Sequence, residues 1–534
     1  MRTMSTPNLF TTLPGNLAPH TLIQGCALLS PYEPGRLLRN QDILLVGERI
    51  AAVGASGTLE LNPLRLDWII DGEGRVAIPG LVNAHTHSLE NMLKATSPSL
   101  PLELWLVPLF TDSVIEWSPH FVYLSALLGA VEMLKSGTTA VLDHLWTVAG
   151  VSTEYLDATM RAYRDAGIRA AVAPSIEDRD LVLEAGARHG LTFPSHPFVD
   201  RFSCWPTIDD QLAALEHFIA TWHDSAEGRL RCLPGPSGIH WCSSQLMDAC
   251  LKLAERYHTG LHLHAVETEV QAAVIRQMLG QGGIAYLDEM GVLKPGTSLA
   301  HAIWLEPGDL DLLARSGTTV VHNPVSNLRL GSGQFPLVEA LNQGVTVALG
   351  SDGSASNDTQ NMFGVLKLAG LMHNQPHSDY KHWPQSMEIL EVATRGGAAA
   401  LGMTSDLGRI MPGQLADLVL LDLDSAAFFP LRDPYLHLVY CESGSSVDTV
   451  IVNGNVVVEH GMVTTVDEQA LRQEIREHCR SSYAGFPESL DSVANTREVL
   501  TTLDTLRNLI LHRECEVKGD HEGSPLLYNG CDRQ

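Results

Sequence analysis

Two stretches near opposite ends of the chain show the same alternation of short apolar runs and turn-forming residues. Residues 42–79 contain DILLVGERIAAVGA and DWIIDGEGRVAIPG, and residues 412–465 contain PGQLADLVLLDLD and VDTVIVNGNVVVEHGMV. Glycine-rich breaks, with Asn453-Gly454 the clearest, are typical of β-hairpins. The pattern predicts that 20–79 and 406–470 pair into one small β-sandwich domain, and that the segment between them folds separately.

The long middle segment, 80–405, alternates strand-like and helix-like patterns. Helical patterns at 121–137 and 384–402 end at Gly137 and Gly402, and glycine favours helix termination. Together with the strand that ends at His87, the runs make eight β-then-α units, which predict an α/β fold: a (β/α)8 TIM barrel with its active site at the C-terminal strand ends. Residues 471–534 are predicted to form a C-terminal helix and a flexible tail, the helix starting after about residue 485. The other seven strand-like runs are 138–143, 168–175, 230–235, 260–265, 297–302, 319–323 and 346–352.

Composition narrows the classes of protein that this chain can belong to. Its 534 residues are 45% hydrophobic and 18% charged, which is enough apolar material for a large core. The formal net charge of −27 repels phosphate backbones and anionic membranes, so neither nucleic acid nor a membrane is an expected partner. Nine cysteines without a CxxC pair indicate reduced thiols, the polar N-terminus lacks the apolar run of a signal peptide, and no apolar stretch is long enough for a membrane span. The sequence therefore predicts a cytoplasmic protein.

Histidines gather at the predicted ends of strands. The first strand ends in GLVNAHTH, where His85 and His87 are two residues apart and therefore point to the same face. HLHAVET places His262 and His264 on a second strand face, and ALGSDGSASND runs an apolar strand into Asp352. Each piece alone can be a buried core histidine or a turn-capping aspartate. At the strand ends of one barrel, they predict one divalent-metal site, with zinc as the default and iron as the alternative.

Five motifs together resemble a known family. PGLVNAHTH, HLHAVETE, LAHAIWL, HNPVSN and ALGSDGSASND stand in the order and spacing of the amidohydrolase superfamily. Residues 20–470 resemble its mononuclear branch, which includes guanine deaminase, adenosylhomocysteine deaminase and the triazine hydrolases. Binuclear members use a lysine on the fourth strand, and this chain has no lysine between Lys135 and Lys252, so a second ion is not expected. The resemblance implies that the metal ligands are His85, His87, His264 and Asp352, and that the usual metal is zinc.

Three residues are candidates for proton transfer. A bound divalent ion lowers the pKa of water to about 7, which makes hydroxide available at neutral pH. Glu267, three residues after His264, can shuttle protons to a ring nitrogen and a leaving amine. Asp352 can accept a proton from the attacking water, and His301 in LAHAIWL can polarise the reacting carbon. The family assigns similar roles to matching positions.

Further residues are candidates for substrate binding. Trp105, Trp146 and Trp241 could each offer a flat face to a planar heterocycle, or could pack in the barrel wall. His322, in HNPVSN after strand 7, is a pocket candidate or a buried structural histidine. Asn357, after strand 8, is a pocket candidate or a turn former.

Two differences from the family argue against an adenosine-type substrate. Leu104 stands where adenosine-type deaminases often carry an acidic residue, with Glu103 one position earlier. Ser237, itself a predicted pocket residue, stands where adenosylhomocysteine-type relatives have histidine.

The sequence predicts a metal-dependent deaminase that removes an amino or substituted amino group from a nitrogen-rich heterocycle such as a purine, pterin or triazine. Hydrolysis of a cyclic amide, a urea or a carbon–halogen bond is the alternative within the superfamily. A non-catalytic scaffold is the alternative outside it, and the full ligand set argues against it. The expected partner is a small heterocyclic substrate, and the expected assembly is a homodimer or a higher homo-oligomer, as in relatives.

Overall fold

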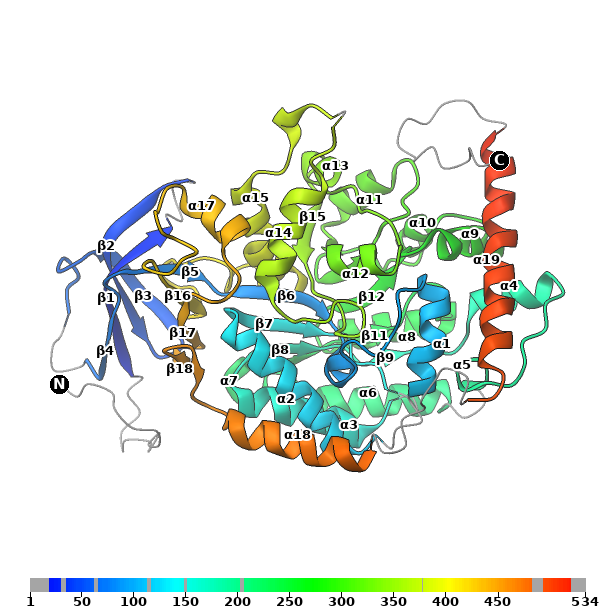
Figure 1. Ribbon diagram of the computed structural model, residues 1–534, viewed down its shortest axis with the longest axis horizontal. Helices are drawn as coiled ribbons and strands as arrows, with labels where there is room; N and C mark the ends of the chain where they lie inside the picture. Colours follow the sequence, from blue (N-terminus) through cyan, green and yellow to red (C-terminus); the bar gives the residue numbers. More distant parts are fainter. Residues whose placement is uncertain are drawn as a thin grey trace.

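The structure, a computed structural model, describes residues 19–29, 35–61, 66–112, 117–147, 151–201, 206–376, 378–482 and 493–519. A sheet built from both ends of the described chain lies on one side of the molecule (Figure 1). The helix-covered middle segment forms the body, and the last helix lies along the opposite edge (Figure 1).

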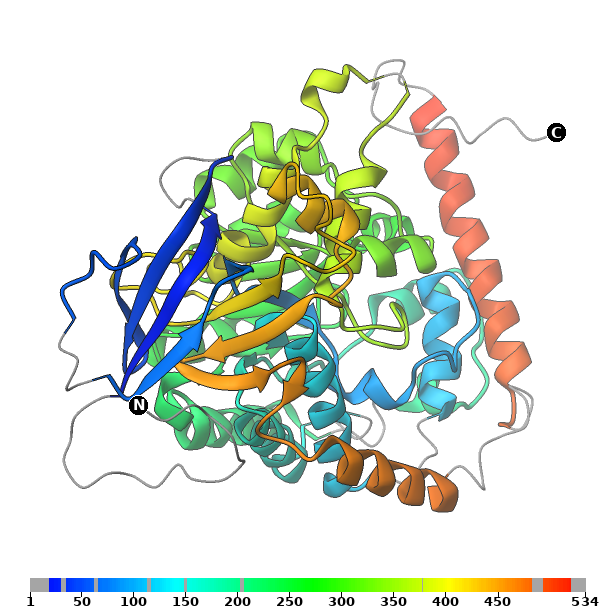
Figure 2. The same cartoon turned by 60° about the vertical axis from the view of Figure 1, so that its left-hand side comes forward.

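The two β-rich pieces pair into one sheet. The sheet contains β1 (His20–Leu29), β2 (Leu37–Val46), β3 (Arg49–Ala55), β4 (Trp68–Asp71), β5 (Arg75–Pro79), β16 (Leu418–Asp422), β17 (Val447–Val452), β18 (Asn455–Glu459) and β19 (Met462–Val463). Its nine strands follow the order β19-β18-β17-β16-β5-β1-β2-β3, with β4 paired to β1. The chain ends meet where β5 and β16 run antiparallel, with Arg75 opposite Asp422. Figure 2 shows these N-terminal strands beside the C-terminal ones.

Alternation along β16 explains why this strand is buried on both faces. Leu418 and Leu420 enter a small apolar cluster that also contains Ile43 and Ile451. Val419 lies between them in sequence and points the other way, into the main core of the molecule. The strand β16 therefore contributes side chains both to the small apolar cluster and to the main core of the body.

Parallel strands form the centre of the body. They are β6 (Leu81–Thr86), β7 (Thr138–Asp143), β8 (Arg169–Val172), β9 (Ser175–Ile176), β10 (Leu230–Cys232), β11 (Gly235–Pro236), β12 (Leu261–Ala265), β13 (Thr297–His301), β14 (Thr319–His322) and β15 (Thr346–Leu349). They pair as two four-stranded sheets, β10-β8-β7-β6 and β12-β13-β14-β15, and a short pair, β11-β9. Almost every strand residue is buried, as expected when helices cover a parallel sheet. Each predicted strand-like run contains one of these strands, and 168–175 and 230–235 each also reach a second, short one.

Helices follow the strands along the chain. They are α1 (Leu102–Asp112), α2 (Pro119–Lys135), α3 (Thr153–Ala166), α4 (Leu181–Arg188), α5 (Pro197–Asp200), α6 (Ile208–Trp222), α7 (Ser225–Gly228), α8 (Ser244–Arg256), α9 (Glu269–Leu279), α10 (Gly283–Glu289), α11 (Asp309–Ser316), α12 (Pro324–Arg329), α13 (Leu337–Asn342), α14 (Met362–Met372) and α17 (Pro434–Leu436). Gly137, just beyond α2, has a φ of 81°, a value that glycine adopts without strain.

The helix predicted at 384–402 is interrupted. It consists of α15 (Ser386–Glu391), a π-helix η5 (Val392–Gly396) and α16 (Gly397–Ala400). A Cβ on Gly396 would lie 1.9 Å from the Val347 carbonyl oxygen, and one on Gly397 would lie 2.3 Å from the Val82 side chain. The wide turn thus lets the backbone press against β15 and β6, a packing contact that helical periodicity cannot reveal.

Two helices, rather than the single predicted one, follow the small sheet: α18 (Glu468–Ser482) and α19 (Thr496–Gly519). Val499 and Leu503 of α19 pack with Val107 of α1 and with Phe198. The predicted flexible tail beyond residue 519 and the polar N-terminus before residue 19 lie outside the described residues.

Among the described helices, none combines the length and apolarity needed to cross a membrane. Among the described side chains, Cys26, Cys232, Cys242, Cys250 and Cys441 are free thiols.

Candidate active site

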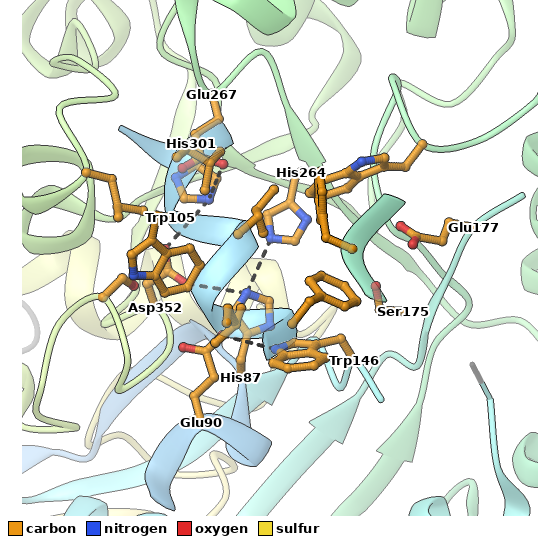
Figure 3. Close-up of a pocket in the computed structure, with 18 of the residues that line it drawn as sticks. His87, Glu90, Trp105, Trp146, Ser175, Glu177, His264, Glu267, His301 and Asp352 are labelled. Carbon is orange, nitrogen blue, oxygen red and sulfur yellow. Dashed lines mark hydrogen bonds and ion pairs between the residues drawn. The ribbon is translucent and has the colours of Figure 1, made fainter. Parts of the chain in front are cut away.

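A pocket with about 780 Å³ of empty space opens where strands of the body end. Its walls carry imidazole, carboxyl, indole and aliphatic side chains (Figure 3). The described residues that line it are His87, Glu90, Leu102, Trp105, Leu106, Leu109, Phe110, Trp146, Thr147, Ser175, Glu177, Phe198, Arg201, Trp241, His264, Glu267, His301, Leu330, Asp352 and Ser356.

The four predicted metal ligands converge at one end of this pocket. Asp352 Oδ1 lies 3.4 Å from His87 Nε2 and 3.5 Å from His85 Nε2. His264 Nε2 lies 3.4 Å from His87 Nε2. Ligand atoms around a tetrahedral ion with metal–nitrogen bonds of 2.0–2.1 Å are separated by roughly 3.3 Å, so these spacings fit one ion. His85 Nε2 is buried without a hydrogen-bond partner among the described residues, as expected for an atom that awaits a ligand.

The second nitrogen of each predicted imidazole ligand is held in place. His87 Nδ1 donates to the His144 carbonyl at 2.6 Å, and His264 Nδ1 donates to the Ser237 carbonyl at 2.6 Å. His85 Nδ1 lies 2.8 Å from His262 Nε2. These bonds orient the rings and leave each Nε2 free to donate its lone pair to a metal.

Protonation at the site also suits a cation. Burial lowers the pKa of His85 to about 4, so its ring is neutral at pH 7. Burial would raise the pKa of Asp352, but its close contacts with the His85, His301 and His87 rings hold that pKa well below its usual range. Burial also lowers the pKa of His264 well below its usual value. Burial lowers the pKa of His87 too, but the nearby Glu90 and Asp352 carboxyl groups raise it above its usual value. Imidazoles that bind through an unprotonated nitrogen, beside an ionised carboxylate, are ligands for one divalent cation. No lysine is among the described residues that line the pocket.

Two of the predicted catalytic residues sit in a strained backbone conformation. His301 has a φ of 72° and Asp352 a φ of 65°, values that non-glycine residues seldom adopt. A hydrogen bond of 2.9 Å from the Asp352 amide to the His85 carbonyl ties the end of β15 to β6. Strain of this kind persists only where surrounding contacts impose it, and it clusters at functional sites.

Glu267 and His301 face each other beside the predicted ligands. His301 Nε2 lies 3.6 Å from Glu267 Oε2 and 3.8 Å from Asp352 Oδ2. Burial, together with the charges of Asp352 and Glu103, raises the pKa of Glu267 well above its usual value. Ser332 donates to Glu267 Oε1 at 3.2 Å. Glu267 is thus a buried carboxyl group whose protonated form is favoured relative to that of an exposed glutamate.

Asn327 orients His301. Its Oδ1 lies 2.8 Å from His301 Nδ1, which favours the tautomer that carries the proton on Nδ1. Burial lowers the pKa of His301, so the ring is neutral. In this state Nε2 presents a lone pair to the pocket.

The predicted substrate-binding residues separate into two groups. Trp105 and Trp241 line the pocket, whereas Ser237, His322 and Asn357 are buried outside its described lining. Ser237 accepts the hydrogen bond from His264 through its carbonyl, so it positions a ligand. His322 Nε2 lies 3.4 Å from His373 Nε2, and the Asn357 amide donates to the Ser351 carbonyl at 2.6 Å. Both motifs are adjacent to the site, but these two side chains turn toward supporting structure.

Glu90 is a pocket residue that the sequence reasoning missed. It lies in the short 3-10 helix η2 (Ser88–Met92), three residues after His87. Its carboxyl oxygens accept from Trp146 Nε1 at 3.0 Å and from the Ala355 amide at 3.1 Å (Figure 3). Burial raises the pKa of Glu90 to about 7. The signal available in the sequence was its short separation from the paired histidines.

Glu177 and Arg201 were missed as well. They lie apart in sequence, in segments without a recognisable motif, and they meet at the side of the pocket away from Asp352. Figure 3 places Glu177 and Ser175 there, across His264 from Glu267.

Comparison with known proteins agrees with this geometry. Residues 76–457 match the sequence profile described as the amidohydrolase family. The chain is 34% identical over 432 residues to a 5'-deoxyadenosine deaminase from Methanothermobacter thermautotrophicus, covering 81% of this chain and 92% of the relative. It is 33% identical over 453 residues to a 5-methylthioadenosine/S-adenosylhomocysteine deaminase from Pelotomaculum thermopropionicum, covering 85% and 96%.

Solved structures resemble the fold. A triazine hydrolase from Arthrobacter aurescens superposes with a TM-score of 0.77 at 29% identity, covering 86% of this chain and 99% of that one. An adenosine deaminase from Xanthomonas campestris with bound zinc superposes with a TM-score of 0.76 at 26% identity, covering 87% and 98%.

Proposed function

The chain belongs to the amidohydrolase family, and from that premise we propose that it is a hydrolytic deaminase of nitrogen heterocycles, with purines as the first ring class to test. One observation carries the proposal: the three-histidine and one-aspartate cluster shares a pocket with a buried acid, Glu267, whose pKa is raised well above its usual value. Removing an amino group from a ring requires a nucleophile on one side and a proton donor on the other.

His85, His87, His264 and Asp352 would hold one divalent cation. The nitrogen and oxygen ligand set suits zinc, and a solved relative carries zinc, so zinc is the proposed metal and iron the alternative. Such a cation would lower the pKa of a water molecule to about 7 and make hydroxide available at neutral pH.

Glu267 and His301 would manage the protons. Glu267, whose pKa is raised well above its usual value by burial, can deliver a proton from Oε2 to a ring nitrogen and then to the departing amine. His301 Nε2 can accept a hydrogen bond from the nucleophile, because Asn327 holds the ring proton on Nδ1. Asp352, held ionised, can take the proton that the nucleophile loses. General acid–base help of this kind contributes about 10²–10⁴ in rate.

Aromatic walls support a planar substrate. Trp105, Trp146 and Trp241 all line the pocket, and indole faces suit a flat ring. Glu103 binds Thr268 and does not line the described pocket, and neither does Leu104. Because relatives over 30% identical are named for adenosine-derived substrates, the differences at Leu104 and Ser237 do not remove purines from the candidates.

The proposal extends to the finer architecture. Contact between β6 and β15, and the bridge between Gly238 and His264, support a closed (β/α)8 barrel over residues 80–405. The separate apolar cluster of the small sheet supports a β-sandwich domain made of 20–79 and 406–470, with 471–534 as a C-terminal extension. A cytoplasmic location and a homo-oligomeric state remain predictions, the second testable by light scattering.

A second reaction has one specific observation in its favour. A triazine hydrolase is among the similar structures, so the same site could displace a leaving group other than ammonia. The alternative predicts release of halide, alkylamine or a urea product.

The test is ammonia release by the zinc-loaded protein over a panel of aminopurines, aminopterins, aminotriazines and cytosine. Release with one ring class, lost in Glu267→Gln, is the expected result. Silence across the panel together with release of another leaving group would replace deamination with the second reaction.

A further inference from the structure

One cation, Arg201, is among the described residues that line the pocket, and it lies at the end away from Asp352. We propose that this distal end accepts a heterocycle with an uncharged or amine-bearing apolar substituent and excludes one that ends in a carboxylate. The inference rests on the proposed function, since it concerns the substrate of the same site. It would distinguish substrates with a neutral tail from those with an amino-acid tail.

Arg201 is already occupied by groups of the protein. Its Nε lies 3.3 Å from Glu177 Oε1, and its Nη2 lies 2.5 Å from Asp180 Oδ2. Its Nη1 donates to the Phe198 carbonyl at 2.6 Å. The guanidinium also lies over the Phe198 ring, 4.6 Å from the centroid, and its side chain is 2% exposed. A planar guanidinium fixed on three sides is poorly placed to receive a ligand carboxylate.

The charge at the distal end also disfavours a substrate carboxylate. Two carboxylates, Glu177 and Asp180, surround one guanidinium, so the ionised cluster carries a net charge of −1. Glu177 is the member of this pair that lines the pocket. Trp241 Nε1, which also faces the pocket, donates to Asp180 at 3.3 Å. A carboxylate on the substrate would be a third negative group in a buried place, whereas a hydrogen-bond donor would be stabilised by Glu177.

Aromatic side chains of α1 and α5 lie beside Arg201 at the distal end. Phe110 and Phe198 line the pocket, and the guanidinium carbon of Arg201 lies 5.6 Å and 4.6 Å from their ring centroids. Apolar walls favour an alkyl or thioalkyl substituent and supply no countercharge for an anion.

The test uses three adenines that differ only at N9, on the opposite side of the ring from the amino group: 9-propyladenine, 9-(3-aminopropyl)adenine and 9-(2-carboxyethyl)adenine. For the zinc-loaded protein, kcat/KM with the propyl and aminopropyl compounds should exceed that with the carboxyethyl compound by at least about 30-fold. Calorimetric Kd values should be lower for the propyl and aminopropyl compounds than for the carboxyethyl compound. Preference for the carboxyethyl compound in either measurement would overturn the inference and make Arg201 an anion-binding residue.

Glu177→Gln sharpens the test, because it removes one negative charge and keeps the shape. The ratio between the aminopropyl and carboxyethyl compounds should shrink by about tenfold, with Glu184→Gln as the matched control. Glu184 is a 41% exposed acid that pairs with Arg179. An unchanged ratio in Glu177→Gln would remove Glu177 from the explanation. If no adenine releases ammonia, deamination of this ring fails, and the Kd order still decides the charge preference separately.

Discussion

The two ends of the pocket are built in different ways. At the metal end, the side chains stand at or just beyond the ends of strands: His85 on β6, His264 on β12, His301 on β13 and Asp352 after β15. Backbone or side-chain hydrogen bonds fix the three imidazole rings. At the distal end, side chains come from α1, α5 and the segment after β9. One end carries the predicted metal ligands and is anchored to strands, and the other combines aromatic side chains with the Glu177–Arg201 pair and is carried by helices and connections.

This contrast suggests different roles for the two ends: the metal end supports turnover, and the distal end selects the substrate. Groups on paired strands keep their spacing, which a metal and a proton relay require, because parallel neighbours hold the backbone on both sides. Groups on surface connections can differ without disturbing that spacing. We therefore expect changes at the metal end to reduce turnover of every substrate, and changes at the distal end to alter which substrate is preferred.

His264→Ala should have the largest effect. Loss of one ligand should abolish metal retention and lower kcat/KM on the order of 10⁴-fold for all substrates, because the site loses several kcal/mol of stabilisation. Metal content by atomic absorption and the circular dichroism spectrum check the prediction. His120→Ala removes an exposed imidazole that pairs with Glu474 and should keep both metal and activity. Full activity in His264→Ala would contradict the ligand assignment.

Glu267→Gln should come next. The amide keeps the shape of the acid but has no titratable proton, so kcat should fall about 10²- to 10⁴-fold while the metal stays bound. Metal analysis and steady-state kinetics on the same preparation separate the two effects. Normal turnover in this variant would show that another group protonates the leaving amine.

The smallest effect should be a change in substrate preference with pH, which depends on Glu177 at the distal end. The pKa of Glu177 is raised to about 7, mainly by burial and also by the nearby Asp180 carboxylate. The Arg201 charge and hydrogen bonds from Arg201 and Ser237 oppose this rise. Above pH 7 the carboxylate is ionised, so the preference for 9-(3-aminopropyl)adenine over 9-propyladenine should grow roughly 3- to 10-fold between pH 6 and pH 8.

The ratio of the two compounds is the useful measurement. Glu90, whose pKa is also raised to about 7, acts on both compounds alike and cancels in the ratio. Glu177→Gln should flatten the profile. A ratio in the wild-type protein that does not change with pH would mean that Glu177 does not contact the substituent.

Local patterns predicted the metal end because its geometry is local. Residues two apart on a strand share a face, so HTH identified His85 and His87, and an apolar run into Asp352 marked a strand end. The same rule could not choose between His262 and His264. In the structure His262 Nε2 lies 2.8 Å from His85 Nδ1 and supports that ring, while His264 lines the pocket.

Other features of the structure depend on contacts between residues that lie far apart in the sequence. His322 and Asn357 belong to motifs beside the site, yet their side chains lie against His373 and the Ser351 carbonyl. The interrupted helix at 392–396 follows from glycines pressed against Val347 and Val82, neighbours from other parts of the chain. Periodicity reports which face of an element is apolar, and it contains no information about such neighbours.

By itself the sequence predicted the alternating strands and helices of the body, two β-rich pieces near opposite ends of the chain and the motifs that carry the candidate metal ligands. Each depends on the side-chain period of one element or on turn chemistry, which neighbouring residues control. Only the tertiary structure decided that Glu90 faces the pocket and that Glu177 and Asp180 surround Arg201. Those contacts join segments without a shared period, so they exist only once the chain has folded around a common core.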